Sequence, residues 1–387
     1  MTPPPRANRR GAALCNAAQW GRGGLGWASG RGQNDLNAQE RSEPAGRGEV
    51  RIEIVDVLRG IAASAVVVQH VAESSGLPGL WYLLELAPGV FGVVLFFLIS
   101  GFVIPLSVRG VSDWRAYALR RVFRIYPLTL FAFALLGALM LLGALPPAGA
   151  PWHVWLANLL LLQDFLRVPA LLGVTWTLPI EFAWYTLFGL SFFLLGRRGL
   201  RLLSLAYPIG MVGLIALSLL LEIRLPFGRI GMLYAALIGM QCFRFAGGEI
   251  GRREILLSCG VFVGLMMVAN WVAFGHFSHP NIKLHHALVP WALASLLFFV
   301  ALFRIKLASP PSWIGQGLLF LGRISFSVYL LHPIVMGLVH PYAEGLAFIV
   351  AVCGLTLPLA WLSFTYVEKP GIEMGRALVR RRRAVAA

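Results

Sequence analysis

From residue 54 onward, long apolar segments alternate with short stretches that hold most of the charged residues. A helix needs about 20 mostly apolar residues to cross the hydrocarbon core of a bilayer. Segments of adequate length recur along this region. They predict an all-α fold, a polytopic helical bundle in a membrane with about ten transmembrane helices. The predicted spans are 57–73, 88–108, 125–145, 177–196, 202–222, 228–246, 255–275, 286–303, 322–341 and 345–367.

The composition agrees with a membrane protein. Of the 387 residues, 58% are hydrophobic and only 13% are charged, with a mean hydropathy of +0.74. Soluble domains carry about 25% charged residues. A chain this apolar cannot bury its hydrophobic side chains in one water-facing core, so the bilayer must be its solvent.

Positive residues gather after the second, fourth, sixth, eighth and tenth predicted spans, which predicts two cytoplasmic termini because Lys and Arg concentrate in cytoplasmic loops. The predicted outer connections 74–87, 223–227 and 342–344 are nearly free of Lys and Arg. The net charge of +16 therefore reflects orientation, and no nucleic-acid-binding motif accompanies it. The clusters contain Arg109, Arg115, Arg120, Arg121, Arg124, Arg197, Arg198, Arg201, Arg244, Arg252, Arg253, Arg304, Lys306, Arg323, Lys369, Arg376 and Arg380–Arg383.

Three regions differ in composition. Residues 1–49 are rich in Gly, Arg, Ala, Asn and Pro and lack an apolar run, so we expect a disordered basic cytoplasmic tail. Residues 50–371 form the predicted transmembrane domain, and residues 372–387 form a basic cytoplasmic tail. Segment 152–163 is apolar but too short to cross, which favours an interfacial or re-entrant position on the outer side.

We expect no metal site. The cysteines form no CxxC pair, and the histidines of the outer connection near residue 280 follow no regular ligand spacing. No nearby carboxylate or cysteine completes a site with them. The residues concerned are Cys15, Cys242, Cys259, Cys353, His276, His279, His285 and His286.

Arg59 and His70 are the most informative residues, because they stand in the apolar segment 57–71. Ionisable residues inside a membrane are costly and are functional-site candidates by default. Their spacing of eleven positions is close to three helical turns, so both lie on nearly one face, about 16 Å apart along the axis. One can bind a charged group while the other acts deeper in the bilayer.

In the outer half of the predicted bundle, His70, Glu181 and His332 share a depth. A carboxylate that holds a histidine in one tautomer makes it a general base. Glu181 is the candidate for this role, and Glu73 competes with it because it is three positions beyond His70 on the same helix. For His332 we favour an interhelical hydrogen bond beside the Pro333 kink.

In the inner half, Arg120, Arg121 and Arg124 precede the third span, at the depth of Arg59. Arg121 and Arg124 are three positions apart and face the same way on a helix. Guanidinium groups suit phosphate oxygens, so these arginines are candidates for binding a phosphorylated cofactor. Any cytoplasmic span end also carries arginines, which is the plainer explanation. Glu368 is the expected salt-bridge partner of this cluster.

Gly101, Phe102 and Pro105 lie late in the second span. A glycine lets helices approach closely, and a proline frees a backbone carbonyl group. Such a combination is common in helical membrane proteins and is weak on its own.

Taken in order, these residues resemble the membrane-bound acyltransferase-3 family, the bacterial O-acyltransferases of cell-envelope and exported glycans. The resemblance covers residues 52–371. It rests on six motifs, which are Asp56-Val-Leu-Arg59-Gly with His70, Ser100-Gly-Phe-Val-Ile-Pro105, Arg121-Val-Phe-Arg124-Ile-Tyr-Pro127, Trp176-Thr-Leu-Pro-Ile-Glu181, Ile324-Ser-Phe-Ser-Val-Tyr-Leu-Leu-His332-Pro333 and Glu368-Lys-Pro370.

The resemblance implies that His70 of the Arg59–His70 pair is catalytic and that Arg121 and Arg124 serve the acyl-CoA donor. It also implies a Gly-Phe-x-x-Pro element, met by Gly101, Phe102 and Pro105 as a structural or substrate-related motif. Two departures stand out in the sequence. Thr177 and Phe182 replace a Ser and an acidic or polar residue, and Ser325-Phe326-Ser327 replaces Ser-Tyr-Ser or Ser-Tyr-Gly.

The chain is therefore expected to be an integral O-acyltransferase of the bacterial inner membrane, with no permanently bound cofactor. It would transfer an acyl group, acetyl by default, from acyl-CoA to a hydroxyl of a cell-envelope or exported glycan or glycolipid. His70 would deprotonate that hydroxyl, oriented by Glu181 or Glu73. A transporter or flippase of a lipid-linked glycan is the alternative, since buried Arg, His and Glu serve that function too.

Overall fold

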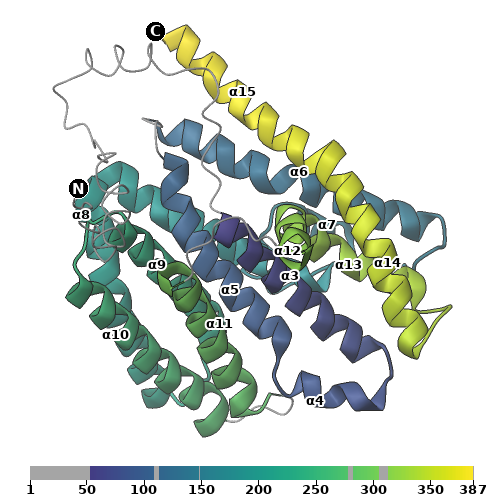
Figure 1. The fold of residues 1–387 in the computed structure, drawn as a ribbon, viewed down its shortest axis with the longest axis horizontal. Helices are drawn as coiled ribbons and strands as arrows, with labels where there is room; N and C mark the ends of the chain where they lie inside the picture. Colours follow the sequence, from purple (N-terminus) through teal and green to yellow (C-terminus); the bar gives the residue numbers. More distant parts are fainter. Residues whose placement is uncertain (1–52, 109–112, 148, 278–281, 305–312, 387) are drawn as a thin grey trace, which may run out of the picture.

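The computed structural model describes residues 53–108, 113–147, 149–277, 282–304 and 313–386, and every regular element in these ranges is a helix. The predicted all-α fold class is confirmed. Figure 1 shows α9, α10 and α11 on one side of the bundle and α13 and α14 on the other, with α3 and α5 between them. The helix α15 runs along α6 at the edge, and the two pack against each other (Figure 1).

The longer helices account for most of the described chain. Short elements connect them, namely η1 (Pro78–Leu80), α4 (Trp81–Leu84), η2 (Ile104–Val108), η3 (Gly173–Trp176), η4 (Val272–His276) and η5 (Phe364–Glu368). The longer helices are α3 (Glu53–Ser74), α5 (Pro88–Val103), α6 (Trp114–Leu141), α7 (Trp152–Leu159), α8 (Thr177–Leu220), α9 (Phe227–Ala246), α10 (Arg252–Trp271), α11 (Leu284–Arg304), α12 (Trp313–Arg323), α13 (Ser325–Val339), α14 (Gly345–Ser363) and α15 (Lys369–Ala386).

The expected number of about ten spans is not confirmed. Seven described helices are long and apolar enough to cross a membrane, or eight if a bent pair is one span. Two of the predicted spans, 177–196 and 202–222, fall in the single element α8, whose backbone breaks at Gly196 with φ 57° and ψ −137°. The predicted boundary therefore coincides with a real break. The helix α9 is not among the seven.

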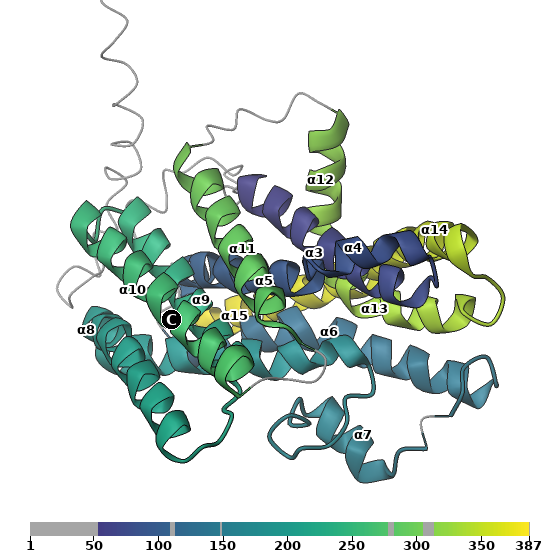
Figure 2. The same cartoon turned by 90° about the horizontal axis from the view of Figure 1, so that it is seen from below.

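The predicted ninth span, 322–341, is two helices and not one. Helices α12 and α13 meet at Ile324 with a bend of 77°. Figure 2 shows α12 running across the direction of α13, and α12 packs against α3. Since α13 alone has 15 residues, it is shorter than a typical span.

Other boundaries moved as well. The helix α6 begins at Trp114, capped by the Asp113 side chain, which accepts a hydrogen bond from the backbone N–H of Arg115 at 3.1 Å. The inner arginines therefore lie within a helix and not before one. The segment 152–163 contains only the short helix α7, as expected for a segment that does not cross. Residues 372–386 of the predicted basic tail belong to the helix α15, and residue 387 and the predicted tail 1–49 lie outside the described residues.

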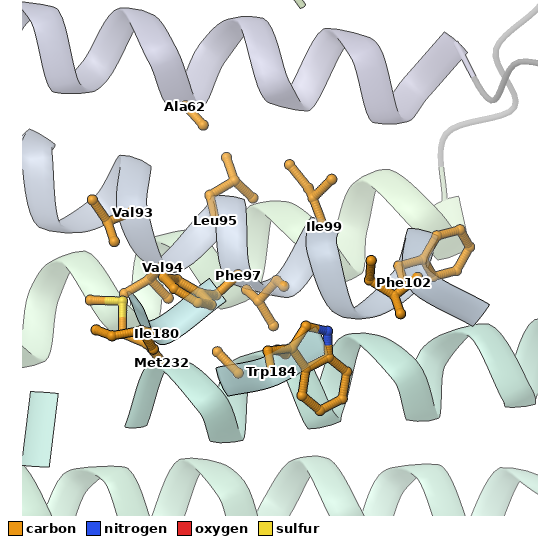
Figure 3. Packing of buried hydrophobic residues seen from close by; sticks show 14 of the residues in the cluster. Ala62, Val93, Val94, Leu95, Phe97, Ile99, Phe102, Ile180, Trp184 and Met232 are labelled. Carbon is orange, nitrogen blue, oxygen red and sulfur yellow. The ribbon is translucent and has the colours of Figure 1, made fainter. Parts of the chain in front are cut away.

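The helix α5 forms the centre of the core. It packs against α3, α9 and α11, and its sequence is apolar on all faces, as expected for a helix surrounded by others. Figure 3 shows Leu95 and Ile99 on the side of α5 that faces Ala62 of α3, with Trp184 of α8 on the opposite side. By contrast, apolar side chains such as Leu205 and Ile209 on α8 are exposed, which suits contact with lipid.

The helices α5 and α9 cross with their backbones in contact. A Cβ atom at Gly101 would lie 1.8 Å from the carbonyl oxygen of Ala236, and one at Gly239 would lie 2.0 Å from that of Leu98. The next residue after Gly101, Phe102, is buried with its ring edge-on to Phe243 at 5.7 Å. Pro105 is buried in η2, where α5 ends. These contacts give the Gly-Phe-x-x-Pro element a packing role.

Replacing Gly101 with alanine should destabilise the protein, because the added methyl group overlaps a backbone carbonyl that cannot move alone. We expect a loss of about 1–3 kcal/mol, typical of overpacking. Thermal unfolding of the purified protein in detergent measures it. Gly264→Ala on α10 is the matched control, since a Cβ there meets nothing within 4 Å. Equal melting temperatures for the two variants would contradict the assigned contact.

Candidate active site

A cavity opens between α3, α5, α6, α8 and α13, and most of the charged residues that line it are cationic. Arg59 comes from α3, Arg121 and Arg124 come from α6, and Glu181 and Tyr185 come from α8. The cavity and the open solvent space at its mouth together hold about 840 Å³. Three guanidinium groups face one carboxylate in this lining, so the cavity favours an anion.

Arg124 is fixed by a buried carboxylate. Its Nη1 lies 2.7 Å from Oε1 of Glu368, and the hydroxyl of Ser327 donates a 2.8 Å hydrogen bond to Oε2 of the same residue. Glu368 is 1% exposed and ends the π-helical segment η5, which leads into α15. The expected pairing of Glu368 with the arginine cluster is thus confirmed. It joins α6, α13 and the last helix at the cavity.

Arg121 is held by aromatic rings. Its guanidinium lies over the ring of Tyr185 at 5.4 Å and over that of Tyr117 at 5.9 Å. Its Nε is buried and has no hydrogen-bond partner within the described part of the chain. Stacking leaves the edge of a guanidinium open for bidentate hydrogen bonds to a carboxylate or phosphate. Of the three arginines, Arg121 is therefore the best placed to bind an added anion.

Arg59 and Arg120, the other two arginines predicted to lie in the inner half, differ in their relation to the cavity. Arg59 lines the cavity and lies 3.9 Å from Oδ1 of Asp56, a loose pair one turn earlier on α3. Arg120 does not line the cavity. It donates a 3.4 Å hydrogen bond to the carbonyl of Ser107 in η2, and this distance is long for a strong bond.

His70 is supported by Glu73 and not by Glu181. Its Nδ1 lies 3.1 Å from Oε2 of Glu73, and Gln69 donates a hydrogen bond to the other oxygen of that carboxylate. The His70 side chain is 39% exposed and is not part of the arginine cavity. Glu181 lies in that cavity and accepts a hydrogen bond from the Tyr185 hydroxyl. The sequence left two candidates for orienting His70, and the structure places Glu73 beside His70 and Glu181 in the arginine cavity.

His332 packs against His70 and does not line the arginine cavity. It is fully buried and its ring stacks on that of His70, with centroids 5.4 Å apart. Its Nδ1 is 3.1 Å from the carbonyl of Val328 on its own helix, and its Nε2 is buried without a partner in the described residues. The expected interhelical hydrogen bond is therefore wrong. The bond stays within α13 because the neighbouring helix presents a ring to His332.

The wall between the cavity and the histidines is aromatic. Tyr329, three positions before His332, lines the cavity, and its hydroxyl contacts the carbonyl of Val174 and the hydroxyl of Thr177 at 2.7 and 2.8 Å. Phe96 of α5 meets the Tyr329 ring edge-on at 5.9 Å. The structure thus brings the arginines of α3 and α6 together, and the histidines of α3 and α13 together.

Tyr185 contacts both Glu181 and Arg121, and it is not among the site residues predicted from the sequence. Its position four residues after Glu181 on one helix was the available signal, since such residues share a face.

Comparisons with known proteins agree with this architecture. A family model described as an acyltransferase domain matches residues 52–365. Acyltransferase MdmB of Streptomyces mycarofaciens is 33% identical over 162 residues, which is 39% of this chain and 42% of that protein. The putative O-acetyltransferase SACOL0978 of Staphylococcus aureus strain COL is 23% identical over 373 residues, or 82% of this chain and 56% of that protein.

Nodulation protein 10 of Rhizobium leguminosarum bv. viciae is 24% identical over 372 residues, covering 86% of this chain and 96% of that protein. The chain thus spans about half the length of the first two relatives. No solved structure matches it. Because the family model covers most of the chain, and several of its helices are apolar enough to cross a membrane, the chain belongs to the acyltransferase-3 family of membrane O-acyltransferases.

Proposed function

We propose that this protein transfers an acyl group, acetyl by default, from acyl-CoA to a hydroxyl group of a cell-envelope or exported glycan. The observation that supports this most directly lies on α3. One unbroken helix carries Arg59 in a cationic cavity and, eleven positions further on, His70 with a carboxylate on its Nδ1. The names of relatives, an O-acetyltransferase and a nodulation protein, are consistent with this reaction.

In this proposal the arginine cavity binds the phosphates of the donor. Arg121 offers an open guanidinium edge, and Arg124 is held rigidly by Glu368. Arginine is well suited to phosphate because its fork of N–H groups matches two oxygens at once. Arg59 adds charge from the opposite helix and guides the pantetheine arm along α3. Acyl-CoA is then a co-substrate, and no permanently bound cofactor is needed.

His70 acts as the general base. Nδ1–H of His70 donates a hydrogen bond to the Glu73 carboxylate, which leaves Nε2 to take a proton from the acceptor hydroxyl. The hydroxyl oxygen bonds to the acyl carbon, the carbon–sulfur bond breaks, and the proton passes from His70 to the departing thiolate. Glu73 also stabilises the imidazolium that exists between these two proton transfers.

For the thioester to reach His70, the Phe96 and Tyr329 rings must move apart or let the arm pass beside them. His70 does not line the cavity, whereas Phe96 and Tyr329 do, and the Tyr329 ring lies 6.4 Å from that of His332. The acceptor approaches from the opposite side, where the His70 side chain is partly exposed. The distribution of positive residues predicts two cytoplasmic termini, which would make that side the outer face of the bacterial inner membrane and would suit a lipid-linked or exported glycan.

Replacing His70 with glutamine should lower acyl transfer by about 10²–10⁴-fold, the usual contribution of a general base. The transfer of labelled acyl groups from acyl-CoA to glycan acceptors by the purified protein in lipid measures this rate. Glu73→Gln should cost less, roughly 10- to 100-fold, because it removes one hydrogen bond to a charged group. The exposed His153→Ala on α7 is the matched control. Transfer at the wild-type rate by His70→Gln would overturn the mechanism.

Replacing Arg121 with glutamine should raise the KM for acyl-CoA by roughly 10- to 100-fold, because a charge-assisted hydrogen bond to phosphate is lost. The maximal rate should change much less. Steady-state kinetics with varied acyl-CoA separates the two constants. Arg253→Gln at the exposed start of α10 removes the same charge outside the cavity and should leave KM unchanged. An equal rise in KM in both variants would mean that net charge alone attracts the donor.

A further inference from the structure

Three possible metal ligands converge where the α4–α5 connection meets the start of α11, away from the arginine cavity. Glu85 directly follows α4, and His285 and His286 lie in the first turn of α11. Figure 1 shows α4 beside that end of α11. Oε2 of Glu85 lies 2.6 Å from Nε2 of His285 and 3.0 Å from Nε2 of His286. The ligand atoms of all three residues lie within 4.8 Å of one another.

This arrangement corrects the view that no carboxylate lies near these histidines. Glu85 is about 200 positions away in the sequence, and only the fold brings it there. His276 is not part of the group, and His279 lies outside the described residues.

We propose that Glu85, His285 and His286 form a zinc site. Two imidazole nitrogens and one carboxylate oxygen are a known Zn²⁺ ligand set, with a water molecule as the fourth ligand. Tetrahedral ligands about 2.0–2.1 Å from zinc stand about 3.3 Å apart. The two Glu85–histidine distances are slightly shorter than this, so the carboxylate must move a little away from each imidazole when an ion enters between them. All three side chains are partly exposed, which gives the ion a path from solvent.

Lys283 is expected to weaken the binding of zinc at this site. Its Nζ lies 3.1 Å from Oε1 of Glu85, so Oε2 is the oxygen that remains for the metal, and the ammonium charge opposes a second cation. Its backbone N–H donates a 3.3 Å hydrogen bond to Nδ1 of His286. Coordination through Nε2 moves the imidazole proton to Nδ1, so this weak bond must break. Zinc binding should therefore become stronger when the Lys283 charge is removed.

The bound ion would fasten the α4–α5 connection to α11. The helix α11 already packs against α5, the central helix of the core, while the four-residue helix α4 has no buried residue. A metal link at Glu85 thus stabilises a part of the protein that has little packing of its own. This role is structural and is independent of the proposed acyl transfer.

Zinc titration of the full-length protein, purified without a histidine tag and stripped with a chelator, tests the proposal. We expect one Zn²⁺ per chain by calorimetry and a rise in melting temperature with zinc. Glu85→Gln, His285→Ala and His286→Ala should each weaken binding by about 10-fold or more, since each removes one of three ligands. Lys283→Gln should strengthen it. His276→Ala is the matched histidine control and should bind as the wild type does.

Cobalt gives a second readout, because tetrahedral Co²⁺ absorbs strongly in the visible range and octahedral Co²⁺ does not. The wild-type spectrum should show the tetrahedral bands, and the Glu85→Gln spectrum should lose them. The absence of zinc binding by the wild-type protein would overturn the proposal. Weak binding at several sites that is unchanged in all three ligand variants would overturn it as well. The cluster would then be a carboxylate hydrogen-bonded to two histidines and a lysine.

Discussion

The position of helix α3 is the constraint on which the rest of the site depends. Two backbone contacts fix it against α12, because a Cβ atom at Gly60 would lie 2.4 Å from the carbonyl oxygen of Leu318, and one at Gly322 would lie 1.8 Å from that of Asp56. In a membrane, such close approach supplies packing that the hydrophobic effect cannot provide between helices. Arg59 is the residue next to this contact, and His70 is three turns further along the same helix. The contacts that fix the position of α3 therefore also fix the positions of Arg59 and His70.

In the interior, the charge of Arg124 is neutralised by Glu368, whereas the charge of Arg121 can act on a bound ligand. Glu368 balances Arg124 and is itself satisfied by Ser327, so the last helix is tied to the cavity. A buried charge without such a partner would cost several kcal/mol. Arg121 instead lies on aromatic rings, which stabilise a guanidinium without neutralising it. The cavity thus keeps positive charge for a ligand, while the Glu73 carboxylate serves the imidazole in a separate place.

The sequence predicted what depends on local pattern. The apolar segments gave the all-helical bundle, and the break at Gly196 followed from Gly-Arg-Arg between two apolar runs. The pairing of Glu368 with an arginine followed from their similar expected depth. Features that depend on how helices tilt and rotate were not predictable. Glu181 has the expected position along its helix but points into the arginine cavity, and the bend at Ile324 divides what reads as one span. Glu85 meets two histidines across the fold, a contact that no spacing indicates.

The central claim is that the cationic cavity and the imidazole serve one donor molecule. A structure of the protein in lipid with a non-reactive thioether analogue of acyl-CoA tests this most directly. The account predicts phosphate oxygens at hydrogen-bond distance from Arg121, with the arm passing the Phe96–Tyr329 wall and the acyl end beside Nε2 of His70. Phosphates bound outside the cavity, or an acyl end that leaves α3 and remains far from His70, would contradict it.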